Sequence, residues 1–483
     1  MTLNDLPVIM VAAMLMGAYI VPLASPARLK GAVWLALGLI LACFIASLVL
    51  AWAVMSGGPI VYSLGGWAAP WGIEVGVDGP VGFMLGTVTL LSLVSLGYAY
   101  AGLQDEVGEK ALRWFWTLCL LLVASMMGIV MARDLFNLFV FVEIASLAAC
   151  GIVSVKGDGP ALESTLRYLI LSALGTGALL FGVALTYMAT GHLNMVFISG
   201  AMAGALARYP GNIYAALGFI TVGLGVKAAL FPLHTWLPDA HSDAPTPSSA
   251  LLSGLVVKVF AFAYWRVLTM AMAPALSAVP VEGFVVALGA MATVAGSVLA
   301  AVQHDIKRLL AYSTVAQVGC IFIGFGLGGQ QAVTGALLHV LYHGAMKAGL
   351  FLAAGSVIVA TGKRSVEDMA GLGKTLPVPM AVFLVMALSM VGIPPLAGFN
   401  SKWYMVMGAL EQGQPLVAII IVLSSALTLV YMYPVLARAY FMAGRAPALR
   451  VGWPSQVPML VLAALVVILG FVPAGALGLA AVP

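Results

Sequence analysis

Five charged side chains lie inside long apolar runs of the sequence, where a charge is costly. They are one glutamate and four lysines: Glu143, Lys227, Lys258, Lys347 and Lys402. A charged residue at the centre of a membrane-spanning helix costs about 2.5–3.5 kcal/mol on insertion scales. Such residues usually mark a proton or ion pathway, so we expect these five side chains to transfer protons or ions within a membrane.

The lysines suit a group that gains and loses protons, because buried lysine can release its proton whereas arginine keeps its charge. Lys227 lies just before a proline-containing interruption at 231–238, where unwound backbone can supply carbonyl groups and admit water. Lys258 lies in the middle of an apolar run, and Lys402 follows a second interruption at 392–398. The alternative for Lys402 is a side chain that extends to the membrane surface.

Glu143 is the acid at the centre of the apolar run 135–155. Burial would neutralise an isolated carboxylate, whereas a nearby lysine would keep it charged. We therefore predict that Glu143 and Lys227 form an ion pair that opens and closes as a switch. A static buried pair is the alternative.

His339, His343 and Lys347 follow one another at intervals of four residues, which places them on one helix face. Three titratable groups in line indicate a proton relay. Two histidines at this spacing can bind zinc, but no third ligand lies near them, and neighbours on one face cannot ligate opposite sides of a haem iron. We expect neither a metal nor a cofactor.

A polar cluster follows the first interruption. It contains His234, Asp239, His241 and Asp243. These side chains could form a funnel that takes up protons, and the alternative is an ordinary polar loop.

The composition identifies the solvent of most of the chain as lipid. Hydrophobic residues make up 63% of the sequence and charged residues 8%, with a mean hydropathy of +1.10. Soluble domains carry about 25% charged residues. The net charge of +4 is small and its cations are scattered, which argues against nucleic-acid binding. We predict an all-α polytopic membrane protein.

About fourteen apolar windows are long enough to span a bilayer. The seventh and twelfth are interrupted, and matching interruptions in two halves are typical of an inverted repeat with a site at mid-membrane. We predict a three-helix segment at 1–111, a five-helix repeat at 112–273 for proton uptake, a second at 280–443 for proton exit, and a C-terminal helix at 444–483. Lys and Arg residues concentrate in alternate loops, which we expect to face the cytoplasm. This predicts that both termini lie on the outer side of a prokaryotic cytoplasmic membrane.

Several stretches resemble the antiporter-like membrane subunits shared by respiratory complex I, Mrp-type cation/proton antiporters and membrane-bound hydrogenases. They are the run 134–143, the Pro-Leu-His-x-Trp-Leu-Pro-Asp-Ala-His core at 232–241, the segment 305–317, the segment 339–347 and the segment 392–402.

The resemblance implies a proton-translocating subunit without an active site of its own. Glu143 and Lys227 would be its modulating pair, Lys258 its central relay and Lys402 its group near the exit. A lysine at 402 favours the Mrp-type antiporter subunits and their hydrogenase relatives. The implied partners are other membrane subunits, including related antiporter-like ones, and a peripheral redox arm. The alternative function is a stand-alone secondary transporter or cation/proton antiporter.

Overall fold

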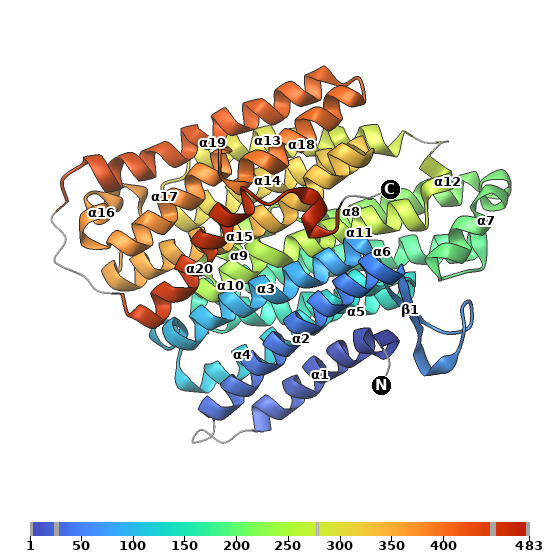
Figure 1. The fold of residues 1–483 in the computed structure, drawn as a ribbon, viewed down its shortest axis with the longest axis horizontal. Helices are drawn as coiled ribbons and strands as arrows, with labels where there is room; N and C mark the ends of the chain where they lie inside the picture. The colour runs from blue at the N-terminus through green and yellow to red at the C-terminus, as the bar shows by residue number, and fades with distance from the viewer. Residues whose placement is uncertain (1–2, 24–28, 277, 279, 445–450, 480–483) are drawn as a thin grey trace.

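The computed structural model describes residues 3–23, 29–276, 278, 280–444 and 451–479, and it is almost entirely helical (Figure 1). The helices are α1 Leu6–Ile20, α2 Leu29–Gly57, α3 Gly79–Gly102, α4 Glu109–Met131, α5 Leu135–Ser154, α6 Gly159–Thr190, α7 Met195–Arg208, α8 Pro210–Lys227, α9 Trp236–Asp243, α10 Thr246–Leu251, α11 Val257–Met270, α12 Ala273–Leu276, α13 Val281–Ala301, α14 Ile306–Leu327, α15 Gln330–Thr361, α16 Leu372–Thr375, α17 Pro377–Val391, α18 Ala397–Glu411, α19 Pro415–Phe441 and α20 Trp453–Leu469.

Within the described residues, eleven helical segments are long and apolar enough to cross a membrane. The chain is therefore a multi-pass membrane protein. The other three expected spans correspond to shorter or broken helices. The seventh is α8, the twelfth is divided into α17 and α18, and the fourteenth is α20.

The loop between α2 and α3 forms an antiparallel hairpin of β1 (Ile60–Ser63) and β2 (Glu74–Val77). The hairpin lies at the same end of the helices as α7 and α12, at the right of Figure 1. We call this end the hairpin face. The end that carries the starts of α2, α4 and α20 is the opposite face.

One helix was absent from the sequence prediction. The loop expected at 190–211 contains α7, a 14-residue helix. It buries Met195, Ile198, Met202 and Ala205 at helical spacing, so one apolar face packs inward.

Two parts of the chain share an order of elements. Asp134 caps α5 and pairs through its backbone with Asn194, whereas Asp305 caps α14 and pairs with Ser365. In each part a 32-residue helix follows, α6 in the first and α15 in the second. Each part then contains a helix that breaks, α8 or α17.

The centre of the molecule is the packing of α10, α11, α14 and α15, which are buried along almost their whole length. Glycine allows the closest approach. A Cβ added at Gly344 of α15 would lie 2.7 Å from the carbonyl oxygen of Gly254. The two backbones therefore touch, as small residues allow between membrane helices.

Candidate functional site

The first helix break places Lys227 at the last position of α8. Turns occupy 228–235 before α9 begins, and Pro232 has no backbone N–H with which to continue the helix. The indole Nε1 of Trp236 donates to the carbonyl oxygen of Val226 at 2.9 Å, which ties α9 back to the end of α8. The break is thus held by a specific contact beside the lysine.

Lys227 is 1% exposed and its ammonium group binds two serines. Nζ donates to Ser146 Oγ of α5 at 2.6 Å and to Ser172 Oγ of α6 at 2.5 Å. These hydroxyls, and not a carboxylate, satisfy the buried charge.

Glu143 and Lys227, predicted to come within ion-pair reach, lie within electrostatic range of each other but do not touch directly. Among the described residues no carboxylate lies within 4.0 Å of the Lys227 ammonium group, because the two serine hydroxyls take that place. Glu143 lies one helical turn before Ser146, close enough for its charge to act on Lys227. Its side chain is half-buried, and Oε2 has no hydrogen-bond partner.

Lys258 follows a π-helical turn that the sequence did not predict. The expected continuous span at 248–272 is divided into α10, the π-helical turn η6 (Leu252–Val256) and α11. A π-helical turn disturbs the regular hydrogen-bond ladder and is often found at functional sites. Lys258 has no solvent exposure, and its Nζ donates to the carbonyl oxygen of Ser253 in that turn.

Lys347 is connected to the same turn through α14. Its Nζ donates to Leu310 O at 2.7 Å and to Ser313 Oγ. Leu310 O also accepts a hydrogen bond from Thr314 Oγ1 at 3.0 Å. Thr314 Oγ1 and Ser253 Oγ are 2.7 Å apart. A short series of polar contacts therefore joins the surroundings of the two lysines.

The rings of His339 and His343 stack, with centroids 5.4 Å apart and planes 13° apart. His339 Nδ1 lies 2.9 Å from Ser401 Oγ of α18, and Nε2 lies 3.1 Å from Gln317 Oε1 of α14. His343 is fully buried, yet neither of its ring nitrogens has a hydrogen-bond partner. The pair therefore combines one well-anchored imidazole with one unsatisfied one.

The second break places Lys402 five residues into α18. The residue is 5% exposed, so its side chain does not extend to the membrane surface. Nζ donates to Met390 O at 3.0 Å and to Ser425 Oγ at 3.0 Å. Met390 lies at the end of α17, where the last carbonyl groups of a helix lack partners within the helix.

The side chains of the predicted uptake cluster have separate partners. His234 packs against Phe231. Asp239 binds Arg167 of α6 at 3.0 Å and Arg308 of α14 at 2.7 Å. His241 is fully buried against the ring of Phe351, with both nitrogens unpartnered, and lies within electrostatic range of Lys347. The structure therefore places Asp239 in an ion-pair network and His241 beside the lysines.

Several polar residues of the site were not singled out from the sequence. They are the partners of the charged groups: Ser146, Ser172, Ser313, Thr314, Gln317, Ser401 and Ser425. A signal existed in α14, where Leu310, Ser313, Thr314 and Gln317 share a helix face. Isolated serines in apolar helices give no comparable signal, because they also bond to their own helix backbone.

Known proteins resemble this chain over most of its length. The profile of the family described as NADH:quinone oxidoreductase/Mrp antiporter, TM, matches residues 132–428. NADH-quinone oxidoreductase subunit N of Desulforudis audaxviator is 40% identical over 439 residues, covering 87% of this chain and 86% of that protein. A Na(+)/H(+) antiporter subunit of Alkalihalophilus pseudofirmus is 30% identical over 430 residues, covering 88% and 85%.

A solved structure agrees with these sequences. A chain of an archaeal respiratory membrane complex, the membrane-bound sulfane sulfur reductase, superposes with a TM-score of 0.90 at 28% identity, covering 98% of this chain and 96% of that chain. The relatives are antiporter-like subunits of membrane complexes. The chain therefore belongs to the NADH:quinone oxidoreductase/Mrp antiporter family of membrane subunits.

Proposed function

We propose that the chain moves protons across the membrane through its own centre. The path uses Glu143, Lys227, Lys258, Lys347, His343, His339 and Lys402. The observation that carries the proposal is the series of contacts from Lys258 through Ser253, Thr314 and Leu310 to Lys347. The hydroxyls of Ser253 and Thr314 can both donate and accept, whereas the carbonyl oxygens of Ser253 and Leu310 that bind the two amines only accept, so proton transfer along this series also requires water beside those carbonyls.

Buried polar atoms without a protein partner support the presence of bound water along the path. His343 and His241 have four buried ring nitrogens between them without a hydrogen-bond partner, and Glu143 Oε2 also lacks one. Buried polar groups that lack a protein partner commonly bind ordered water. Water between these groups completes a proton path that side-chain contacts alone leave interrupted.

The charge of the path favours protons over sodium. Apart from Glu143, its strongly charged groups are lysines. A protonated ammonium group has no free lone pair and cannot ligate a metal ion. Sodium exchange, where it occurs, then belongs to a partner subunit.

The finer architecture follows from the parallel order of elements. We infer fourteen crossings, with inverted five-helix repeats at 112–273 and 280–443. The capping residues Asp134 and Asp305, their bridges to Asn194 and Ser365, and the two broken helices support this repeat. The hairpin face is the outside, and both termini lie on the outer side of a prokaryotic inner membrane.

The chain works within a larger complex. Glu143 is half-buried at the middle of α5, where lipid would be a poor solvent for a carboxylate. A neighbouring membrane subunit, including a related antiporter-like one, can cover this position. Relatives in NADH-quinone oxidoreductase and Mrp complexes support such partners and, in the first case, a peripheral redox arm.

The test is substitution of Lys258 in the complete complex, reconstituted into vesicles. We expect Lys258→Ala and Lys258→Arg each to lower proton uptake about 100-fold or more, the scale of a lost proton-transfer group. Arginine fails because it keeps its proton. The composition of the purified complex controls for assembly. Full proton uptake by the arginine variant would show that Lys258 supplies only a fixed charge.

Sodium is the second readout of the same experiment. Proton uptake should persist without sodium. Sodium flux that depends on Lys258 would contradict the proposed path.

A further inference from the structure

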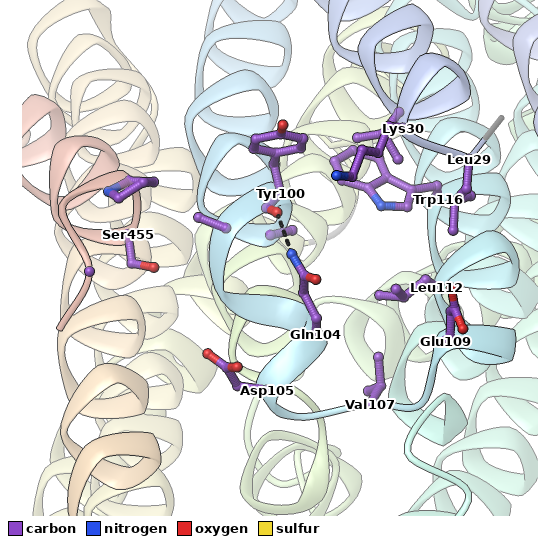
Figure 2. Close-up of a pocket in the computed structure, with 15 residues that line it drawn as sticks. Leu29, Lys30, Tyr100, Gln104, Asp105, Val107, Glu109, Leu112, Trp116 and Ser455 are labelled. Atoms are coloured by element: carbon purple, nitrogen blue, oxygen red, sulfur yellow. Dashed lines mark hydrogen bonds between the residues drawn. The ribbon is translucent and has the colours of Figure 1, made fainter. Parts of the chain in front are cut away.

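A hollow of about 650 Å³ opens at the opposite face of the molecule, between the ends of four helices (Figure 2). It is bordered by the start of α2, the residues after α3, the start of α4 and the start of α20. Its volume lies in the usual range of small-molecule sites, about 300–1,000 Å³. The lysines of the proton path do not line it.

The lining carries both signs of charge. Lys30 supplies an ammonium group, and Asp105 and Glu109 supply carboxylates. All three side chains are exposed, and among the described residues none of them forms an ion pair. Figure 2 shows the Lys30 ammonium group toward one end of the hollow and the two carboxylates around its rim.

Trp116 adds a donor to the wall of the hollow. The residue is 2% exposed, yet its indole nitrogen faces the hollow in Figure 2. Indole nitrogen can only donate a hydrogen bond, and here it belongs to a residue that lines the open hollow. No protein acceptor for this nitrogen is found among the described residues. The geometry thus offers a place for an acceptor from outside the chain.

The position fixes the depth of the ligand. Leu29 and Glu109 are the first residues of α2 and α4, and Gln104 lies just after α3 ends. Ends of membrane-spanning helices lie at the level of the lipid headgroups. Below them, the outer face of α2 exposes large apolar side chains, Trp34 and Leu35 among them, which suit acyl chains.

We propose that this hollow binds the headgroup of a phospholipid that carries a primary amine, such as phosphatidylethanolamine. The lipid phosphate accepts hydrogen bonds from Lys30 and Trp116, and its ammonium group donates to one of the two carboxylates, Asp105 or Glu109, which Figure 2 shows on different sides of the hollow. A headgroup without a cation would place its anion near two carboxylates that have no ion-pair partner among the described residues. A choline headgroup has no N–H with which to bind them.

The test uses the complete complex in lipid nanodiscs and a photoactivatable phosphatidylethanolamine as the probe. We expect the probe to label the peptides that contain Leu29–Val33 and Glu109–Trp116. Unlabelled phosphatidylethanolamine should compete about tenfold better than phosphatidylcholine or phosphatidylglycerol, in line with charge-assisted hydrogen bonds. Equal competition by phosphatidylcholine would overturn the assignment of the amine.

Substitutions separate the two halves of the site. Asp105→Asn with Glu109→Gln should remove the preference for phosphatidylethanolamine while phosphatidylglycerol gains. Lys30→Met should weaken labelling by both lipids. The matched control is Lys363→Met with Asp368→Asn, an exposed pair between α15 and α16 that lies outside the hollow. Unchanged lipid preference in the double acid variant, or labelling of another protein of the complex in place of these peptides, would overturn the proposal.

Discussion

Lys227 and Lys402 both lie at helix breaks, but their ammonium groups meet different acceptors. Lys227 donates to two serine hydroxyls, contributed by α5 and α6, with Glu143 one helical turn away on α5. Lys402 donates to Ser425 and to the backbone carbonyl of Met390, at the end of α17. The carbonyl end of a helix carries a partial negative charge that attracts cations.

The difference concerns which protonation state each site can satisfy. A hydroxyl accepts from an ammonium group and can rotate to donate to the lone pair of a neutral amine. A backbone carbonyl only accepts, so it stabilises the charged lysine and offers nothing to the lone pair of the neutral one. The surroundings of Lys227 therefore offer two hydroxyl donors to the neutral amine, whereas those of Lys402 offer one, the hydroxyl of Ser425.

The first way to break this comparison is to remove the carboxylate beside Lys227. Glu143→Gln keeps the shape of the side chain but removes a charge that acts on the lysine. We expect proton uptake by the reconstituted complex to fall about 10- to 100-fold, because proton-transfer groups depend on their charged neighbours. Glu163→Gln, at an exposed acid paired with Arg167, is the control and should leave the rate unchanged. Wild-type uptake in the Glu143 variant would remove Glu143 from the path.

A second experiment compares the hydroxyl partners themselves. Ser146→Ala with Ser172→Ala leaves the Lys227 ammonium group without its two hydrogen-bond partners. Ser425→Ala leaves Lys402 bound to Met390 O. We expect the double variant to slow proton uptake by more than about tenfold, because it removes two charged hydrogen bonds of about 1.5–3 kcal/mol each, and the single variant to lose less, because Met390 O still accepts from Lys402. Equal losses at the two breaks would show that the carbonyl of Met390 does not distinguish them.

The sequence predicted the charged groups of the path but few of their partners. Intramembrane lysines stand out because each is expensive, and the breaks after Lys227 and before Lys402 follow from proline and glycine chemistry. Ser146 and Ser172 meet Lys227 only after three helices pack together. The sequence predicted that Glu143 and Lys227 approach each other, but it did not reveal Ser146 and Ser172, because charge complementarity does not show neutral competitors for the same ammonium group.

The helices likewise include some that the sequence predicted and some that it did not. Hydropathy located most spans, since lipid imposes a length and an apolar composition on each. It overlooked α7, which is too short to span and reveals itself only through one inward face. It also overlooked the π-helical turn before Lys258, because a single extra residue within a helix leaves the hydrophobic pattern almost intact.

The smallest expected effect tests whether Asp239 takes up protons or joins the two halves of the chain. Its carboxylate bridges Arg167 of α6 and Arg308 of α14, so both oxygens already have cationic partners. As a bridge, Asp239→Asn should lower proton uptake less than about fivefold, because exposed ion pairs contribute little.

The dependence of proton uptake on salt concentration separates the two roles of Asp239 more clearly. Screening acts on exposed charges, so high salt should slow the wild-type complex toward the rate of the Asp239→Asn variant and change the variant itself little. Asp368→Asn, which removes another exposed acid at the same face, is the matched control. A proton-uptake role predicts a different pattern: a loss on the scale of the Lys258 variants that persists at every salt concentration. That result would show that Asp239 takes up protons at the beginning of the proposed path, near the unpartnered imidazole of His241, and does not act only as an ion-pair bridge.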